Sequence, residues 1–213
     1  MTDRLAAAVS LVRQLRTAVS QRRTGLLLPL LAVIAIGLSG CALEHRSNHV
    51  VNVTQDDLAA GGEPYFNAGP VTYQVQVSRQ LNPFSTEDVQ YLAGVSNAQN
   101  LPGDQLWFGV FLWAKNQSGH RQATAGQFEI VDSAGTVYHP VTLNPSVNPF
   151  AWTAQTLAPN GTEPGIDTTA SNGSTGGGLI LFALNNSVYS NRPLTLRIFP
   201  PGGGRPSNVS LDL

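Results

Sequence analysis

Residues 106–113 read LWFGVFLW, an unbroken apolar run in which four of the eight side chains are aromatic. The run is shorter than a typical helix, and its aromatic content favours a strand. Successive side chains of a strand point to opposite faces, so both faces of this one would be apolar. The run therefore predicts a central β-strand that is buried on both sides.

The segments around this run also carry β patterns. Val71, Tyr73, Val75 and Val77 alternate with polar residues, which is typical of a half-buried strand. Two apolar segments flank the turn sequence Asp132-Ser133-Ala134-Gly135 and predict a hairpin. Further strands are expected at residues 178–184, 194–199 and 209–213, and residues 50–53 are either a first edge strand or extended chain.

One short helix is expected after Asn82-Pro83. Ser85 suits the N-cap, and Asp88 follows three residues later, close to the capping-box pattern. Val89, Tyr91 and Leu92 would then face the core.

These elements predict an all-β, immunoglobulin-like β-sandwich with one short helix. The chain has a single cysteine, which excludes the inter-sheet disulfide of antibody domains. Trp107 and Trp113 are the candidates for the core tryptophan of such a sandwich.

A resemblance to a known family lies in four segments: YQVQVSRQLNPFSTEDVQYL (73–92), WFGVFLWAKN (107–116), FEIVDSAGTVYHP (128–140) and LILFAL (179–184). They resemble a bacterial family of unknown function, whose members are export-directed, immunoglobulin-like domains common in actinobacteria. That family is similar in fold to a secreted mycobacterial immunoprotective antigen. The resemblance covers about residues 66–200 and implies a sandwich outside the cytoplasm. Its motifs are strands and turns, so it implies no catalytic residues.

The N-terminal segment has the pattern of an export signal. A basic segment ends at Arg22-Arg23, an apolar run covers residues 26–37, and Leu38-Ser39-Gly40-Cys41 follows. The last four residues resemble a bacterial lipobox, which implies lipid transfer to the Cys41 thiol and cleavage between Gly40 and Cys41. The alternatives are an uncleaved anchor, for which the run is short of ~20 residues and is interrupted by Pro29, and a soluble secreted protein. Arg22-Arg23 leaves twin-arginine export open beside general secretion.

The chain thus divides into a signal peptide (1–40), a lipidated N-terminus with a flexible tether (41–66) and the sandwich (67–213). From Cys41 onward, seven basic and twelve acidic side chains remain, a net charge of −5. Because no basic stripe survives in this part, the charge argues against a nucleic-acid partner.

The sequence offers no constellation typical of catalysis or metal binding. His45 and His49 lie in the tether, and His120 and His139 lie at a turn and a strand end. Residues 172–177 lack the Gly-x-Ser-x-Gly elbow of serine hydrolases. The paired acids Glu87-Asp88 suit a helix N-terminus, where they offset the helix dipole. We expect no catalytic residue, no metal and no cofactor.

Residues 144–177 are rich in Asn, Pro, Thr and Gly and show no strand pattern, yet they contain Phe150 and Trp152. A segment this long is either functional or contains structure that the pattern does not reveal. Phe150 and Trp152 are therefore the candidate partner-binding residues, since aromatic side chains dominate interface energetics. The alternative is that both fold back and cap the sandwich.

The sequence predicts a protein anchored by the Cys41 lipid to the extracytoplasmic face of the cell membrane. Its non-catalytic domain would bind or scaffold an envelope protein or polymer. The alternatives are an accessory subunit or enzyme acting on envelope polymers, and a purely structural surface protein.

Overall fold

The apolar run forms the middle of β4 (Gln105–Lys115) in the computed structural model, which describes residues 50–52 and 65–211. β4 lies inside an antiparallel sheet of order β10-β4-β3-β2, formed with β10 (Gly178–Asn185), β3 (Val71–Leu81) and β2 (Phe66–Ala68). The two-residue strand β9 (Thr162–Glu163) pairs with the end of β4. Every residue from 106 to 112 is buried, so the predicted central strand is confirmed.

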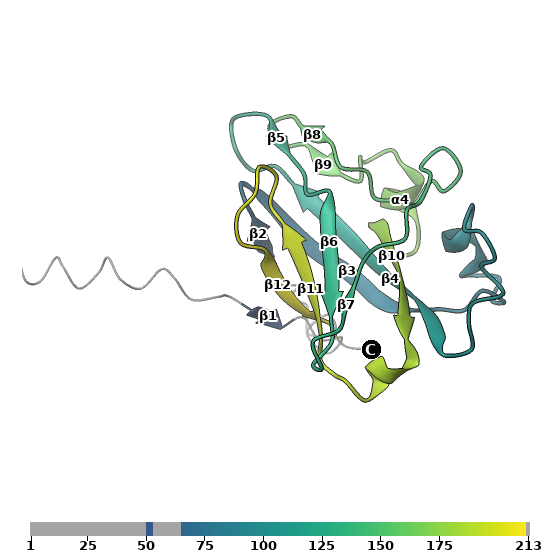
Figure 1. The fold of residues 1–213 in the computed structure, drawn as a ribbon. Helices are drawn as coiled ribbons and strands as arrows, with labels where there is room; N and C mark the ends of the chain where they lie inside the picture. The colour runs from purple at the N-terminus through teal and green to yellow at the C-terminus, as the bar shows by residue number, and fades with distance from the viewer. Residues whose placement is uncertain (1–49, 53–64, 212–213) are drawn as a thin grey trace, which may run out of the picture. The chain divides into compact units, whose positions relative to one another are not determined.

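The second sheet has the order β1-β12-β11-β6-β7 (Figure 1). Its strands are β1 (Val50–Asn52), β12 (Ser207–Leu211), β11 (Leu194–Phe199), β6 (Gln127–Val131) and β7 (Val137–Tyr138). β1 runs parallel to β12, so the segment at residues 50–52 is an edge strand within the range predicted as tether. β6 and β7 form the predicted hairpin, in which Gly135 takes a φ of +87°. A small separate sheet pairs β5 (Gln122–Ala123) with β8 (Thr156–Leu157).

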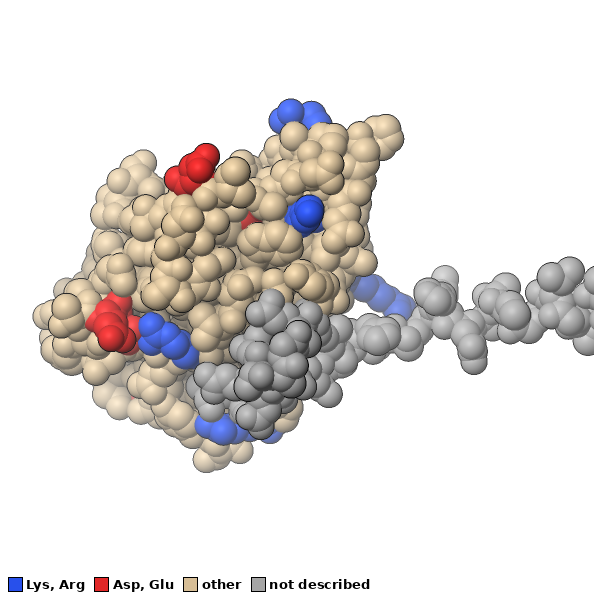
Figure 2. Space-filling view, turned by 180° about the vertical axis from the view of Figure 1, so that it is seen from behind, with Lys and Arg blue, Asp and Glu red and all other residues tan. Residues whose placement is uncertain are grey.

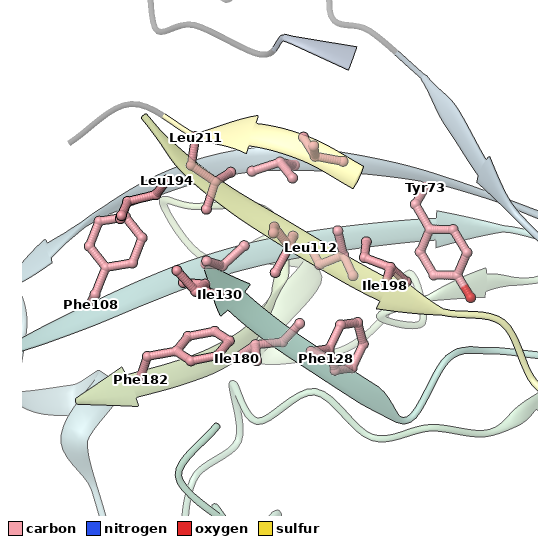
Figure 3. Close-up of a cluster of buried hydrophobic side chains, with 14 of the residues drawn as sticks. Tyr73, Phe108, Leu112, Phe128, Ile130, Ile180, Phe182, Leu194, Ile198 and Leu211 are labelled. Atoms are coloured by element: carbon pink, nitrogen blue, oxygen red, sulfur yellow. The ribbon is translucent and has the colours of Figure 1, made fainter. Parts of the chain in front are cut away.

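The two large sheets pack through their inner faces. Figure 3 shows Phe108 and Leu112 of β4 and Ile180 and Phe182 of β10 in one cluster with side chains of the second sheet. All of the residues labelled in that view are buried. The predicted fold class, an all-β immunoglobulin-like sandwich, is therefore confirmed.

The opposite face of β4 is buried as well, in a second apolar cluster. Its members are Leu81, Tyr91, Leu92, Trp107, Phe111, Phe150, Ala170, Leu179 and Leu181. The expectation that Trp107 or Trp113 fills the inter-sheet core is therefore wrong. Trp107 lies in the second cluster and its Nε1 donates to the Ala98 carbonyl (2.8 Å), and Trp113 packs edge-on against the Tyr65 ring. Trp152 is the tryptophan that packs against the inter-sheet core.

β3 keeps its predicted alternation only in part. Val71, Tyr73 and Val75 are buried, but the register against β4 shifts between Val75 and Val77. The extra residue of this bulge reverses which face of the sheet the following side chains point to. Val77 therefore packs against the second cluster. Gln74 is also buried, so the expected polar face is not fully open to solvent.

The predicted helix is a single 3₁₀ turn, η1 (Val89–Leu92). Tyr91 and Leu92 are buried as expected, but Val89 is 48% exposed, because a short 3₁₀ turn cannot direct all three side chains inward. Asp88 does not act as a dipole partner: it accepts a hydrogen bond from Arg79 (2.5 Å) and one from the Asn82 N–H (2.8 Å). Burial alone would raise the pKa of Asp88, but these bonds outweigh it and hold the pKa below its usual value.

The N-terminal predictions fall on residues outside those described. These are the signal peptide (1–40), the cleavage site at Gly40 and Cys41, and most of the tether. In the part of the chain that the structure does describe, no helix is long and apolar enough to cross a membrane.

Candidate functional site

The segment at residues 144–177 contains structure that its composition did not reveal. It includes β8, β9 and the one-turn helix α4 (Thr169–Asn172), which Thr168 caps by accepting from the Ser171 N–H. The buried Asn148 side chain donates to the Tyr91 carbonyl (2.8 Å) and accepts from the Phe150 N–H (3.0 Å). These bonds fix the backbone just before the two aromatic residues of interest.

Phe150 is buried, with 5% of its surface exposed. Its ring meets the Tyr91 ring edge-on at 4.8 Å, and its carbonyl accepts from the Leu179 N–H of β10 (2.6 Å). Phe150 therefore belongs to the second apolar cluster and presents no exposed ring to a partner.

Trp152 lies on the other side of β10, against the inter-sheet core. Its N–H donates to the Leu179 carbonyl (2.9 Å), and its Nε1 donates to the Ala125 carbonyl (2.8 Å). Its ring packs edge-on against Phe128 at 6.0 Å. A Cβ on Gly178 would come within 2.9 Å of the indole, so this position requires glycine. Trp152 is only partly buried, and part of it remains accessible.

Both aromatic side chains thus fold back onto the sandwich, as the alternative interpretation describes. The two side chains lie apart. Phe150 packs in the second apolar cluster, whereas Trp152 packs against the inter-sheet core. A partner contact through Trp152 stays a prediction.

Beside Trp152 a groove of about 370 Å³ opens between the two sheets. It is lined by the start of β6, the segment after β7 and the start of β10: Gly126, Gln127, Phe128, His139, Pro140, Val141, Thr142, Leu143, Trp152, Leu179, Ile180 and Leu181. No Asp, Glu, Lys or Arg stands among these lining residues. We call this hollow the Trp152 groove.

One contact with an acidic side chain involves a residue of the groove, because His139 lines it. Glu129 on β6 is 3.6 Å from the Arg197 guanidinium and 3.9 Å from His139 Nδ1. On the face drawn in Figure 2, the Lys, Arg, Asp and Glu side chains of the described residues are scattered among uncharged ones. Within residues 50–52 and 65–211, no three His, Cys, Asp or Glu side chains gather in a way that could hold a metal ion.

Glu163 is a residue that sequence reasoning missed. It pairs with Ala114 in the β9–β4 ladder, so its side chain shares the inward face of Ala114 and is only 5% exposed. Burial raises the pKa of its carboxyl to about 7, an effect that a hydrogen bond from the Thr153 N–H partly offsets. Oε2 has no hydrogen-bond partner among the described residues. Glu163 stands in a Glu-Pro-Gly sequence that reads as an ordinary turn, so no sequence signal marked it.

Comparison with known proteins finds no matching family model, and no curated protein matches the sequence. Among solved structures, the yjhA protein of Bacillus subtilis aligns with a TM-score of 0.46 and 13% identity over 70% of this chain and 97% of that one. MPT63, a secreted protein of Mycobacterium tuberculosis, aligns with a TM-score of 0.42 and 10% identity over 78% of this chain and 100% of that one. The ycdA protein of Bacillus subtilis, provisionally classed as a lipoprotein, aligns with a TM-score of 0.43 and 11% identity over 71% of this chain.

The chain spans only 38% of the length of ycdA. Because all three TM-scores are below 0.5, the assignment of the sandwich rests on its strand order, and these likenesses indicate nothing about function.

Proposed function

We propose that this chain is a lipid-anchored protein of the bacterial cell envelope whose β-sandwich binds or scaffolds an envelope protein or polymer without catalysis. The sequence Leu38-Ser39-Gly40-Cys41 after a short apolar run supports the anchor. Acyl chains contribute about 0.8 kcal/mol per buried CH₂, and a cysteine that becomes the N-terminus can carry more than one of them.

The observation that carries the binding role is the Trp152 groove. Ligand sites are concave and mostly apolar, with a few polar groups that set orientation. This groove combines the partly exposed aromatic ring of Trp152 with polar groups at Gln127, His139 and Thr142.

Substitution of Cys41 tests the anchor. The native protein should partition into detergent and have the mass of a chain that begins at Cys41 and carries acyl groups. Cys41→Ala should release the protein into the soluble fraction or leave an uncleaved precursor, and the matched substitution Ser47→Ala should behave as the native chain does. The same partitioning and the same mass for Cys41→Ala and the native protein would contradict the proposal.

One observation favours the second candidate, an enzyme acting on envelope polymers. A carboxyl with a pKa near 7 is poised for general acid–base catalysis. Against this, Glu163 is not among the residues that line the Trp152 groove, and hydrolysis of a glycosidic bond ordinarily takes two carboxyl groups. A loss of polymer hydrolysis on Glu163→Gln, with the fold retained, would favour the enzyme.

A further inference from the structure

The ladder between β6 and β7 ends early, and a proline is the cause. The Asp132 N–H donates to the Thr136 carbonyl (3.1 Å), and Ile130 pairs with Tyr138. In the same register, the partner of Phe128 would be Pro140. Proline has no N–H to donate to a ladder.

At this point the chain crosses from one sheet to the other. Pro140 forms a bridge with Phe182 of β10, and the Val141 N–H donates to the Leu181 carbonyl (2.7 Å). Beside the first residues of β6, the position that a longer β7 would occupy is therefore left without a strand. The Trp152 groove lies in this gap, because residues 126–128 line one wall and residues 139–143 line another.

Phe128 keeps an open backbone edge in the groove. Alternate residues of a strand direct their N–H and C=O to the same side, so those of Phe128 point to the side of Ile130 and Asp132. Among the described residues, the only ladder partner of Phe128 is Ile198 of β11, on the opposite side. Phe128 lines the groove, and a strand edge with an unpaired N–H and C=O is a template for pairing with another chain.

Building on the proposed binding function, we propose that the Trp152 groove takes an extended, uncharged peptide segment of a partner protein, which pairs with Phe128 and continues the line of β7. An extended residue offers one N–H and one C=O on the same side, which matches the open pair on Phe128. Peptides bind sheet edges in this way, with main-chain bonds for affinity and pockets for alternate side chains.

The walls of the groove favour an uncharged peptide. The partly exposed Trp152 ring offers apolar surface for one of its side chains, and Gln127 and Thr142 offer hydrogen-bonding groups. A charged side chain would be desolvated there with no Asp, Glu, Lys or Arg in the lining to pair with it, which is costly. A saccharide also suits an aromatic wall, but it lacks the paired N–H and C=O of a strand residue.

The test selects short random peptides on the full-length protein in detergent and measures their affinity for three forms of it. Thr142→Arg places a bulky charge on the exposed groove wall, and Ala134→Arg places the same side chain on the exposed β6–β7 turn as the control. We expect uncharged peptides whose binding weakens at least about tenfold with Thr142→Arg and is unchanged with Ala134→Arg.

N-methylation of the selected peptide separates strand pairing from side-chain contacts. Methylating the residue that faces Phe128 removes one backbone hydrogen bond and should weaken binding about tenfold, whereas methylating the next residue should have little effect. The Phe128 amide should also exchange more slowly with solvent when the peptide is bound.

Three results would overturn the inference. The first is a peptide affinity that Thr142→Arg leaves unchanged, the second is an equal loss of affinity on N-methylation at successive residues, and the third is selective binding of glycans instead of peptides. None of them touches the anchor, which Cys41→Ala tests separately. Glycan binding at the groove would leave the proposed function standing and remove only the peptide.

Discussion

The buried carboxyl of Glu163 makes the stability of the fold depend on pH. Its ordinary pKa is 4.5, and burial raises it to about 7 in the folded chain. Between these values the folded state holds a proton that the unfolded state has released. The free energy of unfolding should therefore fall by about 1.4 kcal/mol for each pH unit, or about 3 kcal/mol across the window.

The sign follows from the direction of the shift. The stabilisation is fully present below pH 4.5 and is lost as the pH rises through about 7. Asp88 and Asp132 have lowered pKa values, so their contribution is present above 3.8 and is lost only as the pH falls through the folded values. The two effects occupy separate pH ranges.

Urea unfolding at several pH values between about 4.5 and 8 measures the effect. Glu163→Gln removes the titration, so its stability should be nearly constant across this range. The exposed residue Glu87 provides the control, because Glu87→Gln should keep the native profile. Parallel profiles for the native chain and Glu163→Gln would refute the argument that Glu163 holds its proton in the fold.

Two further predictions concern the aromatic residues. Phe111→Ala should lower the free energy of unfolding by about 3–5 kcal/mol, because Phe111 is fully buried and packs edge-on against Tyr91 at 4.8 Å; a loss below about 1 kcal/mol in urea unfolding would place it outside the core. Trp152→Ala should cost about 2–4 kcal/mol and lower the melting temperature, since it removes the packing on Phe128 and the bond to Ala125. An unchanged melting temperature with loss of partner capture would instead identify Trp152 as an interface anchor alone.

The central strand was predictable because burial on both faces leaves a plain signal in the sequence. The same pattern does not show which face of the strand meets the second sheet. An unbroken apolar run has no alternation, so nothing in residues 106–113 distinguishes Trp107 from Phe108 as the residue that meets the second sheet. The tertiary packing turns Phe108 toward the second sheet and Trp107 toward the second cluster, and the tryptophan that reaches the inter-sheet core is Trp152.

The candidate site was only partly visible. β8 and β9 have two residues each, too few for any periodicity, and their partners lie far away in the sequence. The burial of Glu163 depends on that pairing and could not be foreseen. Pro140 did carry a signal, because proline ends a ladder, but its crossing to β10 follows from the packing of the two sheets.

Photo-crosslinking from the Trp152 groove in intact cells tests anchored binding most directly. A photoreactive residue replaces Thr142 on the groove wall and, in a matched variant, Ala134 on the exposed β6–β7 turn. Anchored binding at the groove should give an adduct of discrete mass in the membrane fraction from position 142 and little or none from position 134. No adduct from position 142, or the same adducts from both positions, would contradict it.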